Sequence, residues 1–86
     1  LMEVHYNLGR FHHQLGTPHL AVAAYRRVLA LADQRSEDDV ATGGEGEGAR
    51  AQHGPAREAA HNLVQIYRAS GAISLARAIM SRYLAV

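Results

Sequence analysis

The chain has 86 residues, a formal net charge of +1, 48% hydrophobic side chains and no cysteine. A chain of this length holds one small core or is a piece of a longer protein, and it leaves little room for an enclosed catalytic pocket, so we expect no enzyme. The lack of cysteine excludes disulfide frameworks, thiolate zinc sites and cysteine nucleophiles, and no apolar run approaches the roughly 20 residues that span a bilayer.

The first 32 residues predict two helices joined by a tight turn. The apolar residues of the first helix share one face, at spacings of four, three and four: Val4, Leu8, Phe11 and Leu15. Gly16 ends this helix, because a glycine after the last periodic residue accepts the left-handed conformation of a helix end. Thr17 and Pro18 follow as N-cap and first residue of a second helix, which we expect to end near Asp33.

The next segment, residues 33–54, differs in composition from the rest of the chain. It holds six of the eight acidic residues against two arginines, and five of the eight glycines, and Val40 is its only strong core former. Such a stretch predicts a flexible acidic insert. The other seven arginines flank it, where they either face water or meet an acidic partner or a phosphate backbone.

After Gly54 and Pro55, which mark a helix start, the pattern of the first hairpin returns at an offset of 55. The recurring residues are Asn7-Leu8 as Asn62-Leu63, Gly16 as Gly71, Ala21 as Ala76, and Leu29 as Leu84. A fixed offset indicates one supersecondary unit used twice, and no stretch alternates with the period of a strand. We therefore predict an all-α fold of four helices in two helix-turn-helix hairpins, residues 1–32 and 55–86, separated by a disordered acidic Gly-rich insert at 33–54.

Both hairpins resemble the tetratricopeptide repeat (TPR), in which a leucine and a small residue of one helix meet an alanine and an aromatic residue of the next. The matching residues are Leu8, Gly9, Gly16, Ala21, Tyr25 and Leu29, then Leu63, Tyr67, Gly71 and Ala76. The second copy departs from the pattern at Val64 and Met80, and Asp33 stands where the repeat usually closes with proline. The resemblance implies a fragment of an α-solenoid.

Longer strings carry a closer resemblance: Glu3 to Arg10, His13 to Gly16, His19 to Ala21, Tyr25 to Leu29, Ala60 to Leu63, and Tyr83 to Val86. They are similar to the C-terminal repeats of the TPR-bearing subunit of TFIIIC, the general transcription factor of RNA polymerase III. This resemblance implies a nuclear scaffold for the assembly of TFIIIC and the recruitment of TFIIIB. The implied partners are other TFIIIC subunits, TFIIIB components and upstream TPR repeats of the same chain.

The resemblance also implies a protein-binding surface, because the first helices of such hairpins line the concave side. The candidate residues on it are Glu3, Tyr6, Arg10, His13, Glu58, His61, Gln65 and Arg68. Tyrosine and arginine often dominate protein interfaces, although these side chains could instead face water or a further repeat. Chaperone-binding relatives clamp a carboxylate with lysine and asparagine here, and this sequence departs from that pair.

No catalytic residue, metal site or cofactor is predicted. No two of the six histidines lie three or four residues apart, the spacing of a metal pair on a helix, so packing is the expected role of His5 and His12. The glycine-rich run at 43–48 has no preceding strand or following lysine, unlike a phosphate-binding loop. Direct nucleic-acid contact through the arginines, and an unrelated TPR adaptor or co-chaperone, remain as alternatives.

Overall fold

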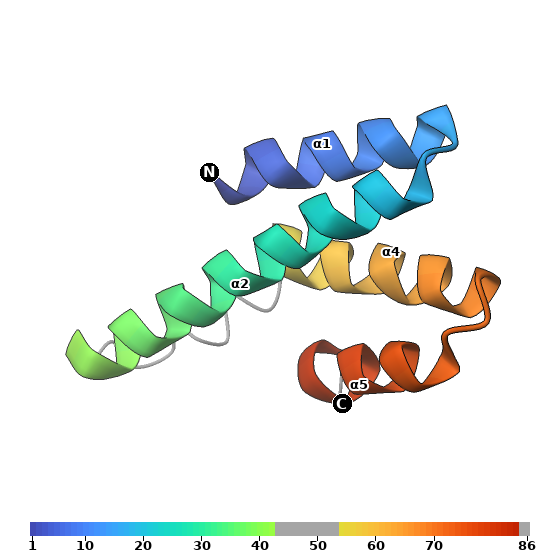
Figure 1. Cartoon of the computed structure of the whole chain (residues 1–86). Coiled ribbons are helices and arrows are strands. Elements are labelled where there is room, and N and C mark those ends of the chain that lie inside the picture. The colour runs from blue at the N-terminus through green and yellow to red at the C-terminus, as the bar shows by residue number, and fades with distance from the viewer. Residues whose placement is uncertain (43–53, 85–86) are drawn as a thin grey trace.

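The computed structural model describes residues 1–42 and 54–84 and contains four helices there (Figure 1). They are α1 (Met2–Leu15), α2 (Pro18–Thr42), α4 (Pro55–Ala69) and α5 (Ile73–Tyr83). No strand occurs in these two ranges, and the prediction of an all-α fold is confirmed. Residues 43–53, half of the predicted flexible insert, lie outside the described residues.

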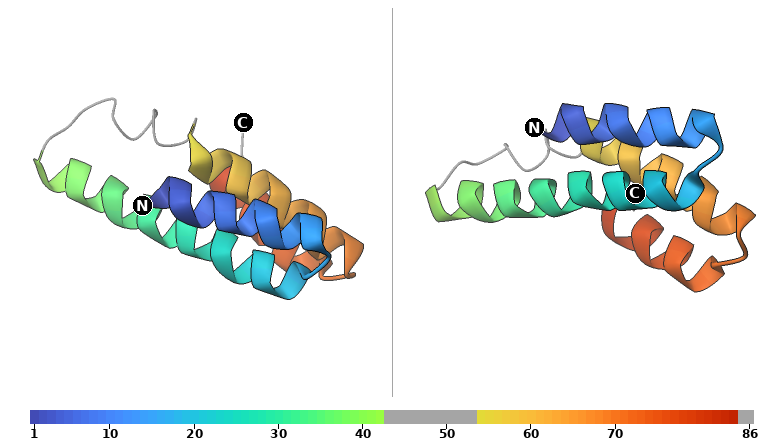
Figure 2. Two further views of the ribbon diagram at one scale, coloured as in Figure 1. Left: turned by 90° about the horizontal axis from the view of Figure 1, so that it is seen from above. Right: turned by 45° about the horizontal axis from the view of Figure 1, so that its top comes forward.

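Each pair of successive helices forms an antiparallel hairpin, and the two hairpins stack. Helix α4 contacts α5 of its own hairpin and both α2 and α1 of the other. Helices α1 and α4 lie side by side and run in the same direction (Figures 1 and 2). Because α4 is covered from both sides, it supplies half of the buried hydrophobic residues: Ala56, Ala59, Ala60, Leu63, Val64, Ile66 and Tyr67.

The two turns have the same geometry at an offset of 55 residues. Gly16 and Gly71 are the two glycines with positive φ among the described residues, at 81° and 84°. The amide after each glycine donates to a carbonyl in the preceding helix, Thr17 to His12 at 2.9 Å and Ala72 to Tyr67 at 2.8 Å. Only glycine adopts this conformation without steric cost, so the duplication read from the sequence is also a duplication of backbone structure.

The helices of the first hairpin approach closely at Gly9. A Cβ atom at this position would lie 2.5 Å from Cε1 of Tyr25, whose side chain is completely buried. The small residue and the aromatic residue of the repeat pattern are therefore in contact. In the second hairpin, Val64 occupies the position equivalent to Gly9, and Met80 occupies the position equivalent to Tyr25. The residue on the first helix is therefore larger than in the first hairpin, and an unbranched side chain replaces the aromatic ring on the second helix.

The predicted end of the second helix near Asp33 is wrong, because α2 continues to Thr42. Residues 33–42 contain neither glycine nor proline, and Gly43 is the first residue that would stop a helix. Asp33 itself joins the hairpins, since its Oδ2 accepts hydrogen bonds from the Tyr83 hydroxyl at 2.8 Å and from Arg82 at 3.2 Å. Asp33, at the position where the repeat usually has its final proline, thus ties α2 to α5 through these hydrogen bonds.

None of the helices within residues 1–42 and 54–84 combines the length and the apolar character that crossing a bilayer requires.

Candidate protein-binding surface

Helices α1 and α4 together carry the eight predicted surface residues. Seven of the eight are exposed, and Tyr6 is half-buried. The structure brings them into contact across the hairpins at one point, where the Tyr6 hydroxyl donates a hydrogen bond of 2.7 Å to Oε2 of Glu58. Along α4, the side chains of His61 and Gln65 lie 3.1 Å apart.

Tyr6 connects the surface to the core beneath it. Its ring lies 6.1 Å from that of Tyr25, and the guanidinium of Arg10 lies 6.0 Å from its centroid. Burial, with the hydrogen bond to Glu58, raises the pKa of Tyr6 above the ordinary value. Tyr6 and Glu58 therefore act as a strut between α1 and α4, and their polar groups already have partners.

A cavity of about 540 Å³ lies at the turn end of this surface. It is lined by residues of both hairpins: His13, Gly16, Pro18, Gln65, Ile66, Ala69 and Ser70. Two of the predicted residues, His13 and Gln65, thus meet at one hollow with a largely apolar floor. Polar groups at the rim of an apolar hollow are typical of a protein-binding site.

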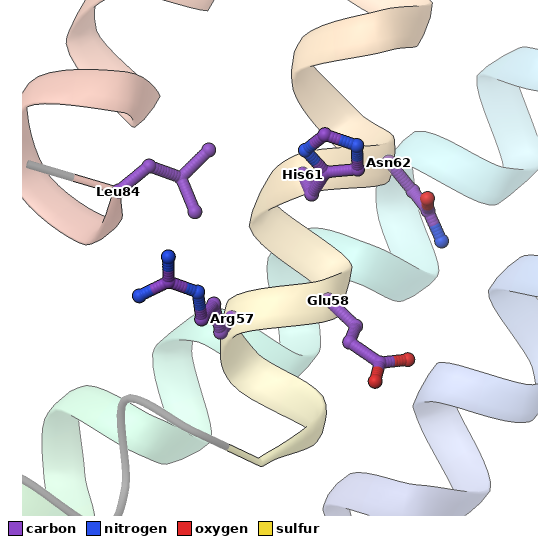
Figure 3. Close-up of a pocket in the computed structure, with 5 residues that line it drawn as sticks. All are labelled: Arg57, Glu58, His61, Asn62 and Leu84. Atoms are coloured by element: carbon purple, nitrogen blue, oxygen red, sulfur yellow. The ribbon is translucent and has the colours of Figure 1, made fainter.

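A second cavity, of about 510 Å³, lies between α4 and the end of α5 and is lined by Arg57, Glu58, His61, Asn62 and Leu84 (Figure 3). Arg57 extends toward Leu84, which directly follows α5, whereas Glu58 and Asn62 point away from it toward α1 and α2. Sequence reasoning missed Arg57 and Leu84. The offset of 55 could have identified Arg57, because it shows that an arginine occupies the position at which the first hairpin has Met2.

The remaining predicted residues are not brought together. Glu3 lines a third cavity, of about 270 Å³, with residues that include Met2 and Pro55. Arg68 is exposed near the end of α4. The described residues of α1 and α4 therefore present a strip of polar side chains with hollows along it.

An uncovered apolar face on α1 was also missed. Its apolar stripe, predicted as one helix face, is exposed over 44 to 63% of each side chain: Val4, Leu8, Phe11 and Leu15. The equivalent α4 residues Ala59, Leu63 and Ile66 are buried, because α2 and α1 cover them. The same pattern is thus covered in one hairpin and open in the other, and large open apolar faces mark interaction sites.

The histidines lie apart from one another. His5 and His12 are half-buried, and the His12 ring packs edge-on against Phe11 with centroids 5.6 Å apart. Among the side chains that the structure describes, residues 1–35 and 54–84, no three potential metal ligands come together.

Comparison with known proteins gives a family and a relative. Residues 3–35 match the tetratricopeptide repeat family. The chain is 42% identical over 82 residues to transcription factor tau subunit sfc4 of Schizosaccharomyces pombe, a match that covers 95% of this chain and 8% of that protein. The chain thus spans less than a tenth of the relative's length. No solved structure matches the chain.

Proposed function

This chain is a tetratricopeptide-repeat region of a TFIIIC subunit, and from that premise we propose that it is a protein-protein interaction scaffold in the initiation of RNA polymerase III transcription in the nucleus. In this role it contributes to the assembly of TFIIIC and to the recruitment of TFIIIB. The relative is named as a transcription factor subunit.

The observation that carries this proposal is the strip of exposed polar side chains along two adjacent parallel helices. Arg10 and His13 on α1, and Gln65 and Arg68 on α4, are exposed and follow the strut between Tyr6 and Glu58 toward the turn ends of the two helices. An arginine contributes strongly to an interface when a partner covers it. We propose that the eight predicted residues, with the cavity at His13 and Gln65, contact an extended segment of another TFIIIC subunit or of a TFIIIB component.

Upstream repeats of the same protein are a further proposed partner. Their support is the open apolar stripe of α1, whose counterpart on α4 is covered by a preceding hairpin. Repeat proteins bury such faces by stacking neighbours.

The test is a pull-down from nuclear extract with the immobilised chain, using antibodies against TFIIIC and TFIIIB subunits. We expect both to be enriched, and we expect the double variant Arg10→Glu, Arg68→Glu to retain at most about a fifth of the signal, as for loss of more than 1 kcal/mol at a binding residue. The double variant Arg26→Glu, Arg27→Glu, at exposed positions of α2, is the matched control and should leave the signal unchanged. Equal signals from the two variants, with both folded by circular dichroism, would contradict the proposed surface.

Direct nucleic-acid contact is the alternative, supported by the exposed guanidinium groups of Arg26, Arg27 and Arg77 on the second helices. It predicts affinity for duplex DNA whose logarithm falls steeply with the logarithm of the salt concentration. A titration at two salt concentrations separates this alternative from protein binding. An unrelated TPR adaptor or co-chaperone would instead give a pull-down without TFIIIC subunits.

A further inference from the structure

The first hairpin has an end face that receives a helix. Helix α4 lies on it, with one shared cavity and two hydrogen bonds along its length. Met2 and Pro55 line one cavity, the Tyr6 hydroxyl binds Glu58 at 2.7 Å, and Asn62 Nδ2 donates to the Tyr25 hydroxyl at 3.3 Å. A face made of Met2, Tyr6 and Tyr25 thus accepts a helix that begins with proline and presents a carboxylate from its first turn.

The second hairpin has the same face, at an offset of 55, with different chemistry. Five residues of the second hairpin occupy positions equivalent to those of the first face: Arg57 (Met2), His61 (Tyr6), Arg77 (Val22), Met80 (Tyr25) and Leu84 (Leu29). We call these five residues the hairpin-two end face. Tyr25 and Leu29 are buried beneath α4, whereas Met80 is 44% exposed and Leu84 is half-buried.

The hairpin-two end face is apolar at its centre and basic around it. Arg57, His61 and Arg77 are exposed, and neither arginine forms an ion pair with any residue in 1–35 or 54–84, the ranges whose side chains the structure describes. Helix α5 contains no acidic residue, and the single acidic residue of α4, Glu58, is bound to Tyr6. The cavity of about 510 Å³ lies at this face, between Arg57, His61 and Leu84 (Figure 3).

We propose that the hairpin-two end face docks an amphipathic helix of a partner protein that carries acidic residues in its first turn and apolar residues after it. The occupant is a helix because α4 occupies the equivalent face of the first hairpin. It is acidic because two exposed guanidinium groups and an imidazole replace methionine, valine and tyrosine. Carboxylates in a first turn also suit the helix dipole, and arginine binds carboxylates in bidentate geometry.

The contacts of α4 define where each group of the partner helix lies. The residue in the place of Pro55 faces Arg57, and the residue in the place of Glu58 faces His61. The residue in the place of Asn62 faces Met80 instead of a tyrosine hydroxyl, so it should be apolar. The partner motif is therefore two carboxylates three residues apart, followed four residues later by an aliphatic side chain. This surface shares only His61 with the eight residues of the polar strip, and the proposal does not depend on the proposed function.

The probe is a synthetic helix peptide with the sequence of residues 54–70 and the changes Pro55→Glu and Asn62→Leu. Titration into the ¹⁵N-labelled chain should shift the amide signals of α4 and α5 at the hairpin-two end face. Replacing both peptide carboxylates with glutamine should weaken binding about threefold to tenfold, the effect expected of two exposed ion pairs. Binding should also weaken as salt rises, because exposed charges are screened.

The matched protein variants are Arg57→Glu and Arg26→Glu, which change the net charge equally. We expect Arg57→Glu to weaken binding of the acidic peptide about as much as the glutamine peptide does, and Arg26→Glu to leave it within about twofold. No signal shift with a peptide that is helical by circular dichroism would overturn the proposal, as would shifts confined to the open stripe of α1.

A second copy of the chain is the competing occupant, because α1 carries Glu3 and an apolar stripe. The free chain would then associate in a concentration-dependent way, and Leu8→Asp would abolish this association. That result would assign the hairpin-two end face to a second copy and overturn the proposal of a partner helix. A chain that stays monomeric in sedimentation while it binds the acidic peptide would support the proposal.

Discussion

Replacement of Gly9 by alanine tests whether close packing of the two helices outweighs helix propensity. On an open helix surface this change stabilises a protein by about 1 kcal/mol. At Gly9 the new Cβ would lie 2.5 Å from the ring of Tyr25. That ring is fully buried, packs 6.1 Å from the ring of Tyr6, and has its hydroxyl bonded to Asn62, so it has little freedom to move.

Forcing an extra methyl group into a packed core costs about 1 to 3 kcal/mol, and this cost exceeds the gain from propensity. We expect Gly9→Ala to lower the free energy of unfolding by about 1 kcal/mol, which corresponds to a fall in Tm of about 4 to 8 °C for a domain of this size. The measurement is urea and thermal unfolding followed by circular dichroism. Ala23→Gly, at an exposed site of α2, is the control for propensity alone.

The second hairpin supplies the rescue, because Val64 and Met80 occupy the positions equivalent to Gly9 and Tyr25. Tyr25→Met should make room for the new methyl group, so the double variant should be more stable than the sum of the single effects by about 1 kcal/mol. A Gly9→Ala protein that melts higher than the parent, or a coupling energy near zero, would refute the reasoning.

Three further predictions concern single side chains. Gly71→Ala should cost about 1 to 2 kcal/mol in urea unfolding, because φ is 84° there while open space surrounds the new methyl group; an unchanged midpoint would contradict this. Tyr83→Phe should cost about 1 kcal/mol by removing the 2.8 Å bond to Asp33, whereas Arg82→Ala should change stability little because Arg82 is exposed; the reverse order would be evidence against the tie. Burial raises the pKa of Tyr25, so the folded state keeps this proton to higher pH than the unfolded chain. The resulting stability is complete below about pH 10 and is lost as pH rises through the folded value; thermal melts across this range should show a shallower loss for Tyr25→Phe, and an equally steep loss would count against the assignment.

Sequence alone determined the features that depend on neighbouring residues in the chain. Gly16 and Gly71 end helices because the left-handed conformation is a local property of glycine, and Pro18 and Pro55 begin the next ones. The offset of 55 identified two copies of one hairpin. The end of α2 was missed because an acidic composition was read as an insert, although residues 33–42 contain nothing that stops a helix.

Tertiary structure decided which side of each helix is covered. The stripe of Val4 and Leu8 and that of Ala59 and Leu63 have the same periodicity, yet the first is exposed and the second is buried. The difference arises because burial depends on whether another hairpin lies against the helix, and periodicity shows only that a face exists. For the same reason the bond of Tyr6 to Glu58, 52 residues apart, and the basic end face at Arg57 and Leu84 became apparent only when the hairpins were stacked.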